Sequence, residues 1–170
     1  MKNSTSSPSR RMSNKWLRRV CADIQGDVLS LGSMSDIDCE GDTYRHYFKS
    51  ASSYLTSDVS DRAEVKLDVR DMSSVPSRRY NCVFCSGVLE HVDDFMAGMR
   101  EITRVLAPGG VLLLGVPFRQ AIHSIPDDFW RFTPFGIEYM LKDYEIIEIK
   151  PIGNSVKNFA ISYWIKALKK

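Results

Sequence analysis

The stretch that decides the fold is residues 80–118, YNCVFCSGVLEHVDDFMAGMREITRVLAPGGVLLLGVPF. Residues 81–85 and 111–116 are short apolar runs beside turn-forming residues, a pattern typical of buried strands. Between them, apolar residues recur at helical spacing, Asp93 or Asp94 can cap the helix start, and residues 107–110, APGG, end it. Two buried strands joined by a helix predict a parallel sheet, and such sheets bind ligands beyond the carboxyl ends of their strands.

The order of motifs in this stretch resembles the class I S-adenosylmethionine-dependent methyltransferases. The run SGVLEHV at 86–92, followed by REITRVLAPGGVLLLGVPF at 100–118, is similar to the fourth and fifth strand region of that family. Residues 127–141, DDFWRFTPFGIEYML, resemble a small bacterial subgroup with a WRFTP motif that is associated with glycan and cell-surface polysaccharide synthesis. The resemblance covers roughly residues 26–153. It implies a Rossmann-like, doubly wound, mostly parallel α/β sheet and transfer of a methyl group from S-adenosylmethionine to a small molecule or glycan, by O-methylation.

Length and composition indicate one globular domain, because the chain has 170 residues and is 44% hydrophobic. Residues 1–13 are basic and polar and predict a flexible tail, and residues 14–153 form the methyltransferase domain. In residues 154–170, apolar positions at helical spacing predict an amphipathic helix, packed on the domain, on a partner subunit or on a membrane surface. The sheet would then lack the closing antiparallel strand common in the family, and the exposed helix and sheet edge would favour a homodimer.

The remaining elements follow from the same patterns. A helix is expected over 14–25 with Gly26 as its stop, strands over 27–31, 51–56, 64–67 and 144–150, and a helix capped by Thr133. Residues 72–79 are too few for a well-formed helix. Cys82 and Cys85 have metal-site spacing, but in a strand they point to opposite faces, so both are expected to be reduced, buried thiols, and Cys21 and Cys39 have no partner pattern either.

The charge is uneven along the chain. Residues 1–26 carry six Lys or Arg and one Asp (+5), residues 151–170 carry four Lys (+4), and the net charge of +2 leaves 2 − 5 − 4 = −7 for the centre. Basic ends suit either solvated segments or contact with an anionic membrane surface. Nucleic acid is not supported as a substrate, because the basic residues lie at the ends of the chain. The chain shows no apolar run of about 20 residues and no signal peptide, so we expect it in the cytoplasm.

The cofactor residues are expected at the carboxyl ends of the strands. Gly32 lies where the chain must turn sharply against its ligand, next to Ser33, but the loop lacks the further glycines usual in the family. It also fits neither G-x-G-x-x-G nor a phosphate loop, which disfavours a nicotinamide or ATP enzyme. A carboxylate after the second strand suits a ribose diol, so Asp58 and the adjacent Val59 are predicted contacts, with a simple turn or helix cap as the alternative for Asp58.

The resemblance adds further cofactor residues. It implies that Asp68 accepts a hydrogen bond from the adenine amine and that Val69 contacts the ring. Asp71 is instead expected to be a turn residue. Ser86 and Gly87 should border the sulfur of the methyl donor.

Candidate substrate residues lie in the first loop and in residues 119–132, which are expected to roof the pocket. Arg45 belongs to a Tyr-Arg pair of the subgroup and could face the cofactor carboxylate or an acidic substrate; an exposed side chain is the alternative. Residues with polar or aromatic groups that suit a sugar, or that could equally support the loop, are Asp127, Asp128, Trp130 and Arg131. His91 could contact substrate or fix its loop. His123 is the predicted general base, with a brace of the roof as the alternative.

No metal ion is expected. In a metal-dependent subset of methyltransferases, two glutamates and a histidine hold a divalent ion near this motif, but Gly87 replaces the first glutamate here. Glu90 and His91 alone make a poor site. The missing glycines, together with Asn81 at a position that is normally acidic, leave a non-catalytic binding or scaffolding protein as the alternative function.

Overall fold

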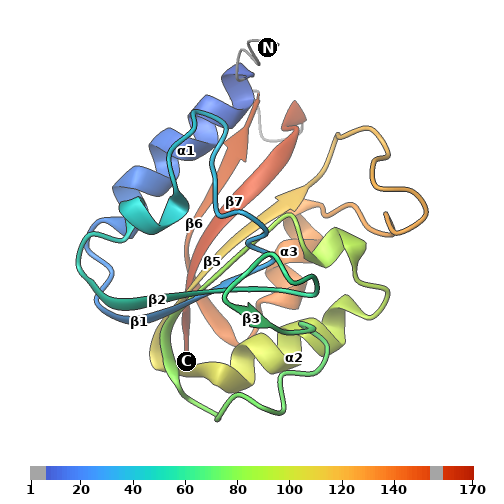
Figure 1. The fold of residues 1–170 in the computed structure, drawn as a ribbon. Coiled ribbons are helices and arrows are strands. Elements are labelled where there is room, and N and C mark those ends of the chain that lie inside the picture. The colour runs from blue at the N-terminus through green and yellow to red at the C-terminus, as the bar shows by residue number, and fades with distance from the viewer. Residues whose placement is uncertain (1–6, 154–158) are drawn as a thin grey trace.

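A computed structural model describes residues 7–153 and 159–170. Its centre is a seven-stranded sheet in the order β3-β2-β1-β4-β5-β7-β6 (Figure 1). The strands are β1 Gly26–Leu31, β2 Ala51–Asp58, β3 Val65–Lys66, β4 Tyr80–Ser86, β5 Leu106–Pro117, β6 Tyr144–Ile152 and β7 Ser162–Lys169. The first five are parallel, and β7 runs antiparallel to both β5 and β6. The predicted Rossmann-like, mostly parallel α/β sheet is confirmed.

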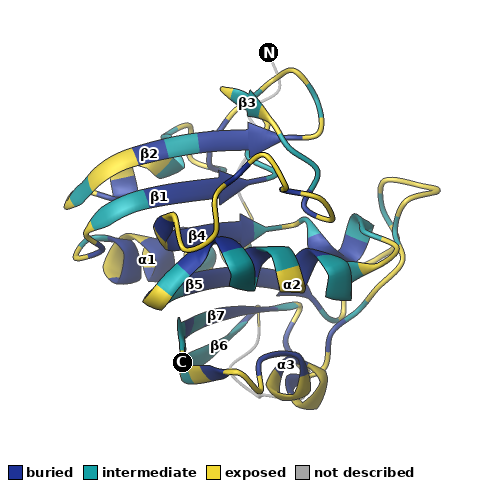
Figure 2. Ribbon diagram, turned by 90° about the horizontal axis from the view of Figure 1, so that it is seen from below, coloured by how far each residue is buried: buried dark blue, intermediate teal, exposed yellow. Residues whose placement is uncertain are grey.

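Helices cover both faces of the sheet (Figure 1). The helix α1 Pro8–Cys21 and the 3₁₀ helix η1 Tyr44–Tyr47 share one hydrophobic core with the sheet, around Leu17, Phe84 and Trp164. The helices α2 Phe95–Val105 and α3 Pro134–Met140 share the other core, around Ile102, Leu112 and Ile137. Figure 2 shows the central strands buried between these two layers.

Parallel pairing brings the loops of the site together. β1 lies between β2 and β4, and β4 pairs with β5, so the carboxyl ends of these four strands lie along one edge of the sheet. The predicted crossover helix between β4 and β5 is α2, and the Asp94 carboxylate caps it by accepting the Ala97 N–H at 2.8 Å. A second 3₁₀ helix, η2 Leu89–His91, follows β4 directly.

The predicted C-terminal helix is wrong where the structure describes it, because residues 162–169 form β7, the closing strand. Tyr163 and Ile165 face one core and Trp164 the other, so the segment is buried on both faces. A strand of this kind is a nearly continuous apolar run, in which helical spacing arises by coincidence. Of the predicted helix, residues 154–158 lie outside the described residues.

The first helix begins earlier than predicted, which corrects the flexible tail for residues 8–13. Ser7 caps the helix by accepting the Arg10 N–H at 3.3 Å, and Pro8 occupies its first turn. The helix ends at Cys21, so Gly26 does not stop it. Gly26 instead opens β1 at φ +80°, where a Cβ would lie 2.2 Å from Oδ1 of Asn81, and that oxygen accepts the Asp27 N–H at 2.9 Å. Asn81 therefore fixes the start of the sheet.

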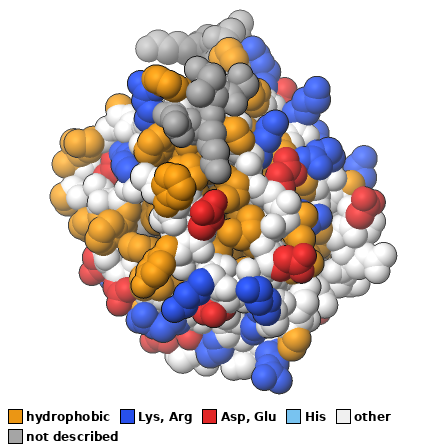
Figure 3. Space-filling view, turned by 180° about the vertical axis from the view of Figure 1, so that it is seen from behind, with side chains coloured by type: hydrophobic (Ala, Val, Ile, Leu, Met, Phe, Trp, Pro, Cys, Tyr) orange, Lys and Arg blue, Asp and Glu red, His pale blue; other side chains and the backbone are white. Residues whose placement is uncertain are grey.

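Other predictions concern the thiols and the short elements. Cys82 and Cys85 are buried, free thiols in opposite cores, as predicted, and Cys39 is free but only partly buried. Thr133 caps α3 by accepting the Gly136 N–H at 3.1 Å, and no helix forms within residues 72–79. Figure 3 shows hydrophobic side chains gathered on the face opposite the view of Figure 1; α3 exposes Phe135 and Tyr139. In the described parts of the chain, every helix is too short or too polar to cross a bilayer.

Candidate active site

A cavity of about 720 Å³ lies at the carboxyl ends of β1, β2 and β4. Strand ends and the loops after them line it, together with two residues of the roof segment. Of the predicted cofactor residues, the lining contains Gly32, Asp58, Val59, Asp68, Val69 and Gly87. Of the predicted substrate residues, it contains His91 and Asp127. These residues lie far apart in the sequence, and the fold brings them together around one cavity, as predicted.

Two glycines let the backbone turn at the floor of the cavity. Gly32, directly after β1, has φ +66°, and a Cβ there would lie 2.3 Å from Cγ2 of Val88. Gly87, directly after β4, also has φ +66°. Both φ values are in the region that glycine tolerates best. Ser33 does not line the cavity; its hydroxyl donates to the Ser30 carbonyl at 2.9 Å and holds the turn.

Asp58 is buried at the end of β2, with 8% of its surface exposed. Its Oδ1 accepts from the Ser60 N–H at 2.8 Å and from the Ser60 hydroxyl at 2.6 Å. Its Oδ2 has no hydrogen bond within the described residues. The carboxylate of this lining residue is therefore held by one oxygen while the other is free to accept, so the turn contact and a ligand contact are compatible.

Asp68 forms an ion pair with Arg70. The Arg70 guanidinium donates from Nε at 3.1 Å and from a terminal nitrogen at 2.7 Å, and it also pairs with Asp93 at 2.9 Å. These hydrogen bonds lower the pKa of Asp68. A ligand amine at Asp68 would therefore share the carboxylate with Arg70. Asp71 is a turn residue as predicted, accepting the Ser73 N–H at 3.0 Å.

Arg45 lies outside the main cavity. It lines an adjoining hollow of about 450 Å³, where it pairs with Glu64 at 2.7 Å and its guanidinium lies 5.1 Å from the Tyr54 ring centre. The two hollows share Met34 and Arg62. Arg45 is thus an exposed side chain, as in the alternative, that pairs with Glu64 and does not line the main cavity.

The roof segment divides into lining residues and supports. Asp127 and Phe129 line the cavity. The Trp130 indole N–H donates to the Val92 carbonyl at 2.8 Å, and its ring packs on Phe95 at 5.1 Å. Trp130 therefore anchors the roof to α2.

Asp128 and Arg131 form a second support. The Arg131 guanidinium donates to both oxygens of Asp128, at 2.6 and 2.7 Å, and the His123 N–H donates to the same carboxylate at 2.7 Å. These contacts hold the pKa of Asp128 well below its usual range. For Asp128, Trp130 and Arg131 the observed contacts match the loop-support alternative.

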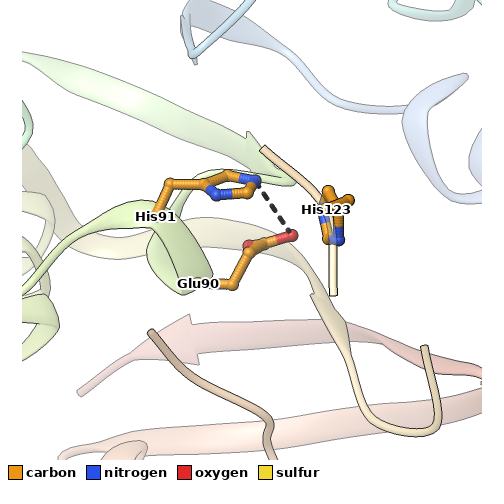
Figure 4. Close-up of side chains that lie close together, drawn as sticks. All are labelled: Glu90, His91 and His123. Carbon is orange, nitrogen blue, oxygen red and sulfur yellow. Dashed lines mark ion pairs between the residues drawn. The ribbon is translucent and has the colours of Figure 1, made fainter. Parts of the chain in front are cut away.

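Glu90, His91 and His123 lie together at the border between floor and roof (Figure 4). His91 Nε2 is 4.0 Å from Glu90 Oε1, and the two imidazole rings meet edge-on with centres 4.9 Å apart. Burial raises the pKa of Glu90, and the adjacent His91, His123 and Arg131 oppose that rise. His123 does not line the cavity, but it contacts His91, which does. Ser86 does not line it either.

Several lining residues were not predicted from the sequence. They are Leu31, Met34, Ser60, Arg62, Leu67, Arg70, Val88, Val92, Asp93 and Phe129. Most directly follow or precede a predicted residue, so a prediction extended to whole strand ends would have included them. Arg62 and Asp93 adjoin no predicted residue, and their places depend on how the loops after β2 and η2 fold.

The profile of a methyltransferase domain family matches residues 10–145, which is most of the chain and includes every strand that contributes to the cavity. The chain belongs to this methyltransferase family. No curated protein matches the methyltransferase in sequence.

Solved structures share its fold. The N-methyltransferase NodS from Bradyrhizobium japonicum WM9, in complex with S-adenosyl-L-homocysteine, aligns over 99% of this chain and 93% of its own, with a TM-score of 0.75 and 13% identity. The 1,6-didemethyltoxoflavin-N1-methyltransferase of Burkholderia thailandensis aligns over 98% and 80%, with a TM-score of 0.71 and 14% identity. The [4+2]-cyclase SpnF aligns over 99% and 84%, with a TM-score of 0.72 and 13% identity. The methyltransferase thus has the class I fold, the fold of enzymes whose methyl donor is S-adenosylmethionine.

Proposed function

We propose that the methyltransferase binds S-adenosylmethionine in the 720 Å³ cavity and transfers its methyl group to a hydroxyl of a small polar molecule, such as a sugar unit of a glycan. The volume falls within the roughly 300–1,000 Å³ of small-ligand sites. NodS and the toxoflavin enzyme, which share the fold, are each described in complex with S-adenosylhomocysteine.

The observation that carries the proposal is the free oxygen of Asp58 at the cavity wall. A ribose diol presents two neighbouring donors, and a carboxylate held by one oxygen can accept from them with the other. Gly32 supports the same placement, because a side chain there would meet Val88 and close the floor. Val69 and Leu67 add an apolar wall beside Asp68 for an aromatic base.

The acceptor is assigned to the roof side of the cavity. His91, Asp127 and Phe129 combine hydrogen-bonding groups with an aromatic ring that is 48% exposed, and sugars bind to such mixed surfaces. In-line methyl transfer needs mainly the positioning of two reactants, which a floor and a roof provide.

The test is a transfer assay in which the purified chain, labelled S-adenosylmethionine and a panel of acceptors are incubated and release of S-adenosylhomocysteine is measured. The panel contains mono- and oligosaccharides, amines and phenols. Turnover with the saccharides, decreased by Asp127→Ala, supports the proposal. Turnover confined to amines or phenols would contradict the acceptor class.

A second candidate, a non-catalytic binding protein, is favoured by one contact. The Arg70 guanidinium pairs with both Asp68 and Asp93. The carboxylate predicted to bind adenine therefore already has a partner within the protein. Under this alternative the wild-type chain would bind neither donor nor product. Recovery of donor binding in Arg70→Ala alone would show that the pair blocks an otherwise complete site.

A further inference from the structure

Three potential metal ligands from two separate segments meet at one point. Glu90 and His91 belong to η2, directly after β4, and His123 follows β5. One ligand atom of each side chain lies within 4.8 Å of those of the other two (Figure 4). Because β4 and β5 are adjacent parallel strands, the sheet itself brings the two segments together. The sequence shows only the Glu90-His91 pair, because His123 lies 32 residues further along the chain.

One oxygen of the Glu90 carboxylate is buried and unpaired among the described residues. The residue is 3% exposed, and its Oε2 has no hydrogen-bond partner within the described residues. Buried polar atoms are nearly always paired, and an unpaired buried carboxylate oxygen is costly. Oε1 is the oxygen that lies 4.0 Å from His91 Nε2, and a cation bound by both carboxylate oxygens would give Oε2 a partner as well.

Both imidazoles are oriented as metal ligands usually are. Nδ1 of His91 is 2.5 Å from the Asp127 carbonyl, so this nitrogen carries the proton and donates it to the carbonyl, which leaves the lone pair of Nε2 for a cation. Nδ1 of His123 lies 3.2 Å from the Ala121 carbonyl and 3.4 Å from Asp128. Such outer hydrogen bonds fix the tautomer and the direction of the free lone pair.

The three ligand atoms, which lie within 4.8 Å of one another, can bind one ion after a small movement of the side chains. Ligand atoms around a tetrahedral ion at about 2.0–2.1 Å lie about 3.3 Å apart, so the atoms must approach one another by about 1.5 Å or less. The side chains of His91 and His123 are 25% and 35% exposed, so they have room to move. Gly87, which has no side chain, leaves the space beside Glu90 open toward the cavity.

We propose that Glu90, His91 and His123 bind a divalent transition-metal ion such as Zn²⁺ or Mn²⁺, with one coordination position open to the cavity. One carboxylate and two imidazoles suit this class of ion. The site's role rests on the proposed function: an ion held there would bind the acceptor oxygen and lower the pKa of its hydroxyl, whose proton would pass to solvent water. The methyl group would then move from the sulfonium sulfur to that oxygen, and S-adenosylhomocysteine would leave. His123 is then a ligand, which replaces its predicted role as general base.

The test uses the untagged full chain, treated with a chelator and dialysed, without any methyl donor. Calorimetric titration with Zn²⁺ and Mn²⁺ is followed by metal analysis of the protein after gel filtration. We expect a single ion per chain, and at least a tenfold loss of affinity in Glu90→Gln and in His123→Gln. Co²⁺ serves as a spectroscopic probe. Its absorption spectrum should be that of nitrogen and oxygen ligands, without a thiolate-to-metal charge-transfer band.

His46→Gln is the matched control, because this histidine pairs with exposed Asp42 at 2.7 Å and lies outside the cluster. Cys39→Ser removes the one partly exposed thiol. Thermal melts establish that each variant is folded, and the partly exposed His123 keeps the test valid if Glu90→Gln unfolds. No bound ion, or equal affinity in Glu90→Gln, His123→Gln and His46→Gln, would overturn the proposal. Because no donor is present, this result is independent of whether the chain transfers methyl groups.

Discussion

At the scale of single residues, Gly32 shapes the floor of the donor cavity by having no side chain. Gly32→Ala combines a strained φ of +66° with a clash against Val88, whereas Gly41→Ala has a φ of +88° and open space around it. We expect both to lower the free energy of unfolding by about 1–2 kcal/mol through backbone strain. Gly32→Ala should cost more and also weaken donor binding. Denaturant unfolding measures the difference, and equal costs would show that the Val88 contact is relieved without penalty.

Asp38 provides a residue-scale test of pH dependence. Burial alone would raise the pKa of this carboxyl, but hydrogen bonds from the Tyr47 hydroxyl and from the Glu40 and Asp42 N–H groups outweigh it and lower the pKa. A lowered folded-state pKa means that the stabilisation is complete above the unfolded value of about 3.9 and is lost as the pH falls through the folded value.

Asp38→Asn should therefore cost about 1–3 kcal/mol near neutral pH, and the difference from the wild type should shrink below about pH 4. Urea unfolding of both proteins between pH 7 and pH 3 measures this. A difference that stays constant to the lowest pH would contradict the assigned contacts.

At the scale of elements, β7 separates what the sequence predicts from what it does not. Tyr163 and Ile165 are fully buried and Trp164 is 7% exposed, although the three are consecutive. On a surface helix, successive residues lie 100° apart, so three in a row cannot all be buried. In so short a segment, the apolar pattern of a helix cannot be told from that of a strand buried on both faces. Pairing with β5 and β6 makes the segment a strand, and the sequence does not show that pairing.

Alanine substitution at each of these three positions should cost about 2–5 kcal/mol in the free energy of unfolding. Phe159→Ala is the control, because this side chain is 54% exposed. Chemical denaturation gives the values. A near-neutral effect at one of the three positions would favour the helix over the strand.

At the scale of the whole molecule, the sequence predicts the sheet because buried strands and crossover helices leave strong periodic patterns. It predicts the cavity for the same reason, since strand ends meet wherever the sheet is parallel. It does not show that Arg70 forms an ion pair with Asp68, or that His123 lies beside Glu90 and His91. Those contacts depend on loop conformations that tertiary packing sets. Asp128 and Arg131 illustrate the same limit: residue types that suit a ligand are used here to pair with each other.

Thiol reactivity tests the packing of the whole domain. Cys21, Cys82 and Cys85 are buried, and burial raises the pKa of each thiol, whereas Cys39 is partly exposed. Thiolates are the reactive form, so an aromatic disulfide reagent should modify at most Cys39 in the native protein and all four cysteines after unfolding. In Cys39→Ser the native protein should not react. Rapid modification of that variant would mean that one of the two cores is open.

The most direct measurement of the central claim, that the strand-end cavity is the donor site, is calorimetric titration with S-adenosylhomocysteine. The wild type should bind with saturation, and Asp58→Ala should weaken binding roughly tenfold or more, because hydrogen bonds to a charged group contribute about 1.5–3 kcal/mol. Asp61→Ala is the control, since Asp61 is exposed, pairs with Lys66 at 3.3 Å and does not line the cavity. Absence of binding by the wild type at millimolar ligand, or equal affinity in Asp58→Ala and the wild type, would contradict the account.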